Sequence, residues 1–485
     1  MAILLVGCVG APDVAKVASA PGPTPDSPAA KAAAVQAAAT AAQNVIGEPI
    51  EQIHDHTNAA LHTNHSGLTL VNWSPLIPSE IGTEGFAALR IVGDDAFIGN
   101  DGAHAGFLIV NISDPAAPRL VAQYSTPGGA SQEAVPTPDG NWVFLNLQRQ
   151  PAATEIVSSP TRGDGLGIQI IDTHDRAHPK LAGFVPVEAV GTHVMFYKEW
   201  QGVPYLIYNG QPAGAPTPQG TYTEPVGNVV HIARFEVNAG VPNLVIVGVV
   251  AYPQSLGATT RGGCFPHDQY AEEHPTTHQL LLYIAWWDCG AVIADISNPS
   301  APMILHVDSD MAPSTRNSIH YFRPDPQARD GKVIAWSGPE IDLSPGEPGY
   351  LRSYDISDPT AFKQIGHWRL PGSVENDKPF IFSPHNFDFQ GDLMALAHYH
   401  AGIWVLNVSD PTQPFAIAYY LPHGNETHPF DGKVWRKTPN FPEPYFPNVY
   451  DAKWHNGYLF VSERGSGLYV LKLDASASGA ARPSG

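Results

Sequence analysis

The chain has 485 residues with a formal net charge of −20, and only 15% of its residues are charged. A chain this acidic, without a basic stripe, excludes a protein built to bind the phosphate backbone of a nucleic acid. It contains 45 glycines and 47 prolines, and helical periodicity is confined to its N-terminal part, so we expect an all-β, turn-rich fold.

The first eight residues resemble a bacterial lipoprotein signal, in which Cys8 would carry the lipid. This stretch lacks a basic start, so a buried strand or a chance match is the alternative. Residues 9–48 are rich in Ala, Pro and Ser and are predicted to form a flexible tether. No later stretch is long and apolar enough to cross a bilayer, so membrane contact is expected only through a lipid on Cys8.

One pattern recurs along the rest of the chain at intervals of roughly sixty residues, which is typical of a repeat architecture. Its copies are GFLIVNISDPAAP from Gly106, GIQIIDTHDRAHP from Gly167, HIARFEVNAGVP from His231, VIADISNPSAP from Val292, LRSYDISDPTAF from Leu351, GIWVLNVSDPTQP from Gly402 and GLYVLKLDAS from Gly467. Each is an apolar run ended by turn residues, since Asp bonds the backbone two residues on and Pro cannot continue a strand ladder. Two apolar runs precede each copy and one follows it. Four short strands in each of seven repeats predict a seven-bladed β-propeller over residues 49–476, followed by a disordered tail at 477–485.

The two ends of this array predict how the ring closes. A strand-like run, GLTLVNWS from Gly67, precedes the first repeat, whereas the last repeat lacks an outer strand. We therefore expect the N-terminal strand to complete the last blade, because an open array would leave exposed strand edges.

The glycine, the apolar run and the DISDPxxP ending resemble the LVIVD repeat of secreted and surface-attached bacterial and archaeal β-propellers. The resemblance covers about residues 84–474. It implies an extracytoplasmic protein, at the cell surface or in the periplasm. It implies little about activity, because the repeated motif lies in outer structural strands.

Two further cysteines lie near the fourth repeat. Cys264 is in the loop that enters the fourth blade, and Cys289 is in a turn within that blade. A disulfide is the expected pairing in an extracytoplasmic compartment. Free thiols or metal ligands are the alternatives.

The first strands of the seven repeats carry the candidate chemistry. Aligned by their distance from the blade starts, they give one column of residues, namely Phe86, Glu133, His193, His278, His320, His385 and Asp451. Inner strands run parallel around a propeller channel, so residues at one level converge on its axis. We expect the four histidines to bind a transition metal ion, copper, iron or zinc. Glu133 and Asp451 would then move protons or orient a ligand.

Two other interpretations of this column stay open. The histidines could form a purely structural, hydrogen-bonded ring, or the alignment could be wrong, since a slip of one residue turns a side chain away from the channel. The leading hypothesis is a cell-surface binding or scaffold protein with a metal ion at one mouth of the channel. A copper or iron oxidoreductase that uses the same ring of histidines is the first alternative. A metal-free interaction module is the second alternative. The expected partner is a small molecule or a surface protein.

Overall fold

A computed structural model of the chain describes residues 54–55, 65–77, 85–101, 105–126, 131–148, 166–187, 191–210, 229–253, 256, 264–309, 317–342, 348–374, 381–422 and 447–478. The predicted lipid-bearing Cys8 and the tether at 9–48 lie outside these residues. No helix in the described ranges has both the length and the apolar character needed to cross a bilayer.

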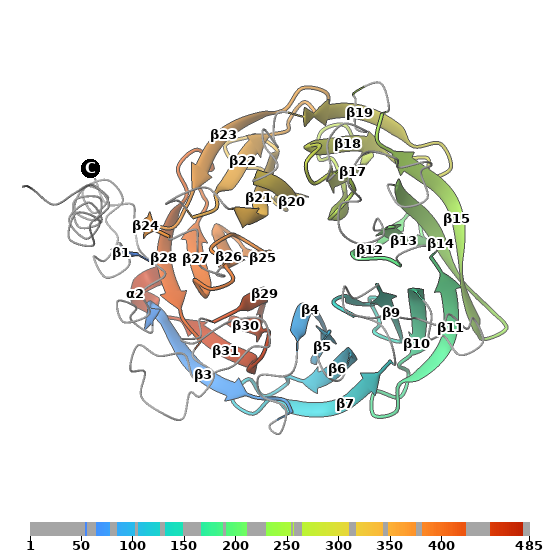
Figure 1. Cartoon of the computed structure of the whole chain (residues 1–485), viewed down its shortest axis with the longest axis horizontal. Helices are drawn as coiled ribbons and strands as arrows, with labels where there is room; N and C mark the ends of the chain where they lie inside the picture. The colour runs from blue at the N-terminus through green and yellow to red at the C-terminus, as the bar shows by residue number, and fades with distance from the viewer. Residues whose placement is uncertain are drawn as a thin grey trace, which may run out of the picture.

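Seven antiparallel sheets stand around a central axis, each a propeller blade with its first strand innermost (Figure 1). Blades 1 to 3 are β4 (Phe86–Val92), β5 (Asp95–Asn100), β6 (Gly106–Asn111) and β7 (Arg119–Ser125); β8 (Ala134–Pro136), β9 (Trp142–Leu147), β10 (Gly167–Asp172) and β11 (Lys180–Pro186); and β12 (Met195–Trp200), β13 (Val203–Asn209), β14 (Val229–Asn238) and β15 (Val241–Ala251). Blades 4 and 5 are β16 (Gln269–Glu273), β17 (Leu280–Ala285), β18 (Ala291–Asp295) and β19 (Met303–Asp308); and β20 (Asn317–Pro324), β21 (Ile334–Asp342), β22 (Leu351–Asp355) and β23 (Lys363–Trp368). Blades 6 and 7 are β25 (Phe387–Gln390), β26 (Leu393–Ala397), β27 (Ile403–Asn407) and β28 (Phe415–Tyr420); and β29 (Val449–His455), β30 (Tyr458–Glu463), β31 (Gly467–Leu473) and β3 (Leu68–Ser74). The predicted seven-bladed propeller is confirmed.

The repeated motif supplies the third strand of each blade, and its residues explain where that strand begins and ends. Gly106 opens β6 with a φ of 145°, and a Cβ there would lie 2.0 Å from the carbonyl oxygen of Tyr124 on the outer strand. Only glycine fits so close to the neighbouring backbone. At the other end of the motif, Asp295 accepts a hydrogen bond from the amide of Ser297 at 2.8 Å, which turns the chain out of the ladder.

The N-terminal strand closes the ring as predicted. β3 pairs antiparallel with β31, from Leu68 opposite Leu473 to Ser74 opposite Leu468. The chain adds two smaller features beside this closure. β2 (His65–Ser66) lies along the outer edge of β28, and β1 (His54–Asp55) pairs in parallel with β24 (Gly372–Ser373). A short helix, α2 (Ala475–Ser478), follows β31, and Ala477 packs between the sixth and seventh blades.

The hydrophobic core of the described residues lies between neighbouring blades rather than in one centre. Phe97 and Phe107 of blade 1, for example, pack against Val143 and Leu145 of blade 2. Equivalent clusters join each blade to the next, including blade 7 to blade 1. The blades are therefore held at fixed spacing, which fixes the distance between side chains that point into the channel.

Cys264 and Cys289 form a disulfide, with their Cα atoms 5.1 Å apart. Both cysteines are buried in the cluster between blades 3 and 4. Of the pairings that the sequence leaves open, the structure has the disulfide, so neither cysteine offers a free thiolate to a metal.

Candidate metal centre

Four histidines meet at one mouth of the channel, one from each of four consecutive blades. They are His193 before β12, His267 before β16, His320 in β20 and His385 before β25. Their ring centroids are 4.5 Å apart between His193 and His267, 4.6 Å between His267 and His320, and 4.2 Å between His320 and His385. All four side chains are buried. The structure thus brings together three of the four predicted histidines and adds His267.

Two buried asparagines fix the backbone that carries the first two histidines. Asn146, at the second strand of blade 2, donates from Nδ2 to the carbonyl oxygens of Thr192 and His193 at 3.1 and 2.9 Å. Asn209, one blade later, donates to the carbonyls of Pro266 and His267 at 2.7 and 2.5 Å. Each asparagine therefore links its own blade to the start of the next inner strand.

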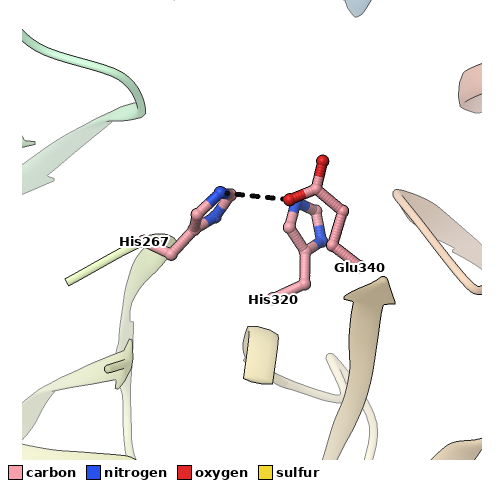
Figure 2. A group of neighbouring side chains, drawn as sticks. All are labelled: His267, His320 and Glu340. Carbon is pink, nitrogen blue, oxygen red and sulfur yellow. Dashed lines mark ion pairs between the residues drawn. The ribbon is translucent and has the colours of Figure 1, made fainter. Parts of the chain in front are cut away.

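Glu340 brings a carboxylate to the same place from the end of β21, the second strand of blade 5. Figure 2 shows its side chain reaching between His267 and His320. One ligand atom from each of these three residues lies within 4.8 Å of the other two. Glu340 Oε2 is 3.4 Å from His267 Nε2, and Nε2 of His193 is 3.1 Å from the same nitrogen. Donor atoms from three blades thus converge on one point.

Acceptors behind the rings hold three of the histidines by their Nδ1 atoms. His193 Nδ1 faces Gln148 Oε1 at 2.8 Å, His267 Nδ1 faces Asp268 Oδ1 at 3.0 Å, and His385 Nδ1 faces the Tyr450 carbonyl at 2.7 Å. An Nδ1 that donates to such an acceptor leaves the lone pair on Nε2. This is how metal-binding histidines are usually oriented.

Two ring nitrogens of the cluster are buried and bond to nothing in the described part of the chain. They are Nδ1 of His320 and Nε2 of His385. A buried polar atom without a partner costs free energy, so native structures rarely keep one without a reason. A cation between the rings would satisfy such atoms, and the donor set of imidazoles and one carboxylate fits copper, iron or zinc.

Burial and neighbouring charges give these histidines unequal pKa values. Burial, with the charge of His267, lowers the pKa of His193 to about 3. Burial opposes charge on His267 as well, but its hydrogen bonds with Asp268 and Glu340 outweigh this effect and raise its pKa to about 9. Burial also opposes ionisation of Glu340, yet the hydrogen bond from His267 and the positive charge of the histidines hold its pKa well below the usual value. These shifts favour an ionised Glu340 beside a protonated His267, so a metal ion that binds Nε2 of His267 must displace its proton.

Two aromatic residues in unusual backbone conformations flank the histidine row. Trp287 has a φ of 39° and stacks on His267 with centroids 4.7 Å apart. Tyr399 has a φ of 42°, packs against His385 at 4.7 Å and donates its hydroxyl to Glu340 Oε1 at 2.8 Å. A positive φ is unfavourable for bulky residues and persists only where the surrounding structure holds it.

The structure places His278 away from this cluster. It lies in the turn between β16 and β17, where its side chain is 75% exposed and pairs with Glu273. The predicted column is therefore wrong at blade 4, because the inner strand of that blade is Gln269–Glu273 and begins before His278. Phe86 also leaves the column, since it packs in the hydrophobic cluster between blades 7 and 1.

Glu133 and Asp451 are both buried, and both form ion pairs with the guanidinium of Arg90. Arg90 contacts Glu133 Oε2 at 2.7 Å and Asp451 Oδ2 at 3.1 Å. Asp451 also accepts from Lys453 Nζ at 2.5 Å and from the Leu89 amide at 2.9 Å. Burial raises the pKa of Glu133 to about 7. The proposed catalytic roles of this pair stay a prediction, since none of the hydrogen bonds and ion pairs found for either carboxylate joins it to a histidine of the cluster.

A local sequence signal could have found His267. Pro266, His267 and Asp268 repeat the Pro384, His385 and Asn386 triplet, with the histidine in the same relation to its second strand. The amides of His267 and His385 donate to Ala285 and Ala397, respectively, each at 2.8 Å. Glu340 carries no comparable signal, because it belongs to a second strand, whereas the histidine column lies at the first strands.

Part of the sequence matches a known family model. A sequence model of the LVIVD repeat matches residues 88–126 and 281–307. No curated protein matches the chain.

Solved structures similar to the chain include a catalytically inactive virginiamycin B lyase from Staphylococcus aureus with quinupristin. It is 11% identical, with a TM-score of 0.47 over 84% of this chain and 99% of the lyase. The β-propeller domain of Cps50 (Swd1) from Myceliophteria thermophila is 9% identical, with a TM-score of 0.45 over 84% of this chain and 99% of that domain. Sqt1 from Saccharomyces cerevisiae is 11% identical, with a TM-score of 0.44 over 79% of this chain and 81% of its own.

Proposed function

Because the chain is an LVIVD-repeat β-propeller with this histidine cluster at its channel mouth, we propose that it works as a metal-binding propeller. His193, His267, His320, His385 and Glu340 are the proposed ligands. The observation that carries the proposal is the orientation of three rings by acceptors at Nδ1, which leaves each Nε2 to bind a cation. A transition metal is the expected ion, because imidazole suits copper, iron, zinc and nickel.

The metal would have a structural consequence as well as a chemical one. Its ligands come from blades 3, 4, 5 and 6, so one bound ion would join four blades across the channel. A binding or scaffold role, in which the metal shapes the mouth for a small molecule or a surface protein, agrees best with this arrangement. Such binding stabilises the folded chain by mass action.

A metal-dependent oxidoreductase is the second candidate, and the contact between Tyr399 and Glu340 favours it. A tyrosine hydroxyl 2.8 Å from a proposed ligand carboxylate can donate a proton next to the metal. A bound copper or iron ion would supply the electron transfer. Burial raises the pKa of Glu133 to about 7, so this carboxylate would exchange protons near neutral pH. A metal-free interaction module is the function left if no ion binds.

We also propose that the protein works outside the cytoplasm, at the cell surface or in the periplasm. The Cys264–Cys289 disulfide supports this location, since disulfides persist mainly in oxidising compartments. A lipid on Cys8 would anchor it. Labelling of the cell-grown protein with a fatty acid probe, with Cys8→Ala as the control, tests the anchor directly.

Elemental analysis of the purified protein tests the metal. We expect about one transition-metal ion for each chain, lost in His267→Ala and His320→Ala. His278→Ala is the matched control, because this histidine is exposed and should leave the metal content unchanged. Wild-type protein that stays metal-free after exposure to Zn²⁺, Cu²⁺ and Fe²⁺ would overturn the proposal, and equal metal loss in His278→Ala would overturn the ligand set.

A further inference from the structure

The turn between β17 and β18, Trp286–Gly290, contacts both chain segments that carry the proposed ligands His267 and His320. The indole of Trp287 stacks on the ring of His267, with centroids 4.7 Å apart and planes at 24°. The carbonyl oxygen of the same residue accepts a hydrogen bond from the amide of Ile319 at 3.2 Å. Ile319 directly precedes His320. One residue thus touches the His267 ring and the backbone beside His320.

The disulfide ties this turn to the segment that carries His267. Cys289 belongs to the turn, and Cys264 lies three residues before His267. Phe265, which lies between Cys264 and His267 in the sequence, also stacks on Trp287, with centroids 5.3 Å apart and planes at 21°, and its ring is 6.1 Å from that of His267. Phe265, Trp287 and His267 therefore form one cluster of three rings, and the disulfide joins the two chain segments that carry them.

The turn is itself held in place. The backbone of Cys289 donates to the carbonyl of Trp286 at 2.8 Å and accepts from the hydroxyl of Tyr252 at 3.1 Å. The φ of 39° at Trp287 is a conformation that a free turn would leave readily. The disulfide and the buried cluster around it keep that conformation.

We infer that Trp287 and the Cys264–Cys289 disulfide position His267 and His320, so that the oxidised disulfide is required for tight metal binding. The inference rests on the proposed metal site. Reduction would break the S–S bond and form two thiols, with two electrons and two protons supplied by a reductant such as a dithiol, which becomes a disulfide. The segment before His267 then loses its link to the turn. The metal site would thereby respond to the redox state of its surroundings.

Titration with Zn²⁺ by calorimetry and with Co²⁺ by visible absorbance tests the inference, with a phosphine as the reductant because dithiols themselves bind these metals. We expect reduction of wild-type protein, and the double variant C264A/C289A, to weaken binding about tenfold or more and to shift the Co²⁺ bands. Cys8 is the one cysteine that the double variant keeps, so the variant has no disulfide within the chain. Its affinity should therefore no longer respond to the reductant. Far-UV circular dichroism is expected to stay unchanged.

Substitution of Trp287 separates ring stacking from general stability. Trp287→Ala should weaken Co²⁺ binding about tenfold and alter its spectrum, whereas Trp287→Phe, which keeps a stacked ring, should bind within about threefold of wild type. Reduced protein that binds Zn²⁺ as tightly as oxidised protein overturns the inference while leaving the metal site intact. Oxidised wild-type protein that binds neither ion overturns the metal site itself.

Discussion

Replacement of Asn209 by Ala should damage both the fold and the metal site, because this one side chain joins blade 3 to blade 4. Its Oδ1 accepts from the amides of His193 and Val194 at 3.1 and 3.0 Å. Its Nδ2 donates to the carbonyls of Pro266 and His267. The residue is fully buried, so water would not replace the bonds that Ala removes.

The magnitude follows from the groups left behind. A buried donor that loses its partner costs about 1–3 kcal/mol, and Asn209→Ala orphans two amide donors. The expected loss in the free energy of unfolding is therefore about 2–6 kcal/mol. Zn²⁺ affinity should fall as well, by about tenfold or more, because the backbone at two proposed ligands is released.

Urea unfolding followed by far-UV circular dichroism measures the first effect, and calorimetric titration with Zn²⁺ measures the second. Asn100→Ala is the matched control, since Asn100 accepts from the Gly85 amide at 3.0 Å in blade 1, which carries no proposed ligand. The control should lower stability without changing Zn²⁺ affinity. An Asn209→Ala protein within about 1 kcal/mol of wild type would refute the reasoning, as would equal affinity losses in both variants.

Three further substitutions test separate parts of the structure. Burial raises the pKa of Glu133 to about 7, so its ionisation lowers stability as pH rises from 4.5 through 7. Glu133→Gln should therefore gain about 3 kcal/mol relative to wild type between pH 4.5 and 8 in urea titrations, and a constant difference would contradict this. His398 is buried and neither ring nitrogen bonds to another residue in the described part of the chain, and burial lowers its pKa to about 3. Wild type should lose stability as pH falls below 6.5, and His398→Leu should remove about 2 kcal/mol of that loss at pH 5. The same pH dependence in both proteins would contradict this. Gly106→Ala should lower the melting temperature far more than Gly93→Ala, because an added Cβ at Gly93 meets nothing within 4 Å whereas at Gly106 it meets the Tyr124 carbonyl. Similar melting temperatures for the two would argue against the steric account.

The fold was predictable because its signals are local and repeated. The motif that begins at Gly106 ends its strand through turn chemistry within the same dozen residues, and the strand from Leu68 had to pair with the blade that lacked one. The metal centre was only half predictable. His193, His320 and His385 followed from alignment of first strands, but His267 did not, because blade 4 begins earlier than its spacing suggests.

Glu340 illustrates the part that alignment could not reach. Glu340 lies at the end of β21, a full strand later in the sequence than the inner strand β20 of the same blade. It meets the histidines only in the folded structure. Gln148, which orients the ring of His193, is likewise identified by its distance from that ring and not by its position in the repeat. Contacts of this kind need coordinates.

The pairing of β3 with β31 has a consequence for how the protein is made. Thr69 bonds Asp474 across 405 residues of chain, so a polypeptide that emerges from the ribosome or an export channel N-terminus first must hold β3 without its partner β31 until the last blade arrives. An interrupted chain would expose that unpaired edge, which is a site for aggregation or proteolysis. Synthesis to the very end thus decides between a sealed ring and a short-lived fragment.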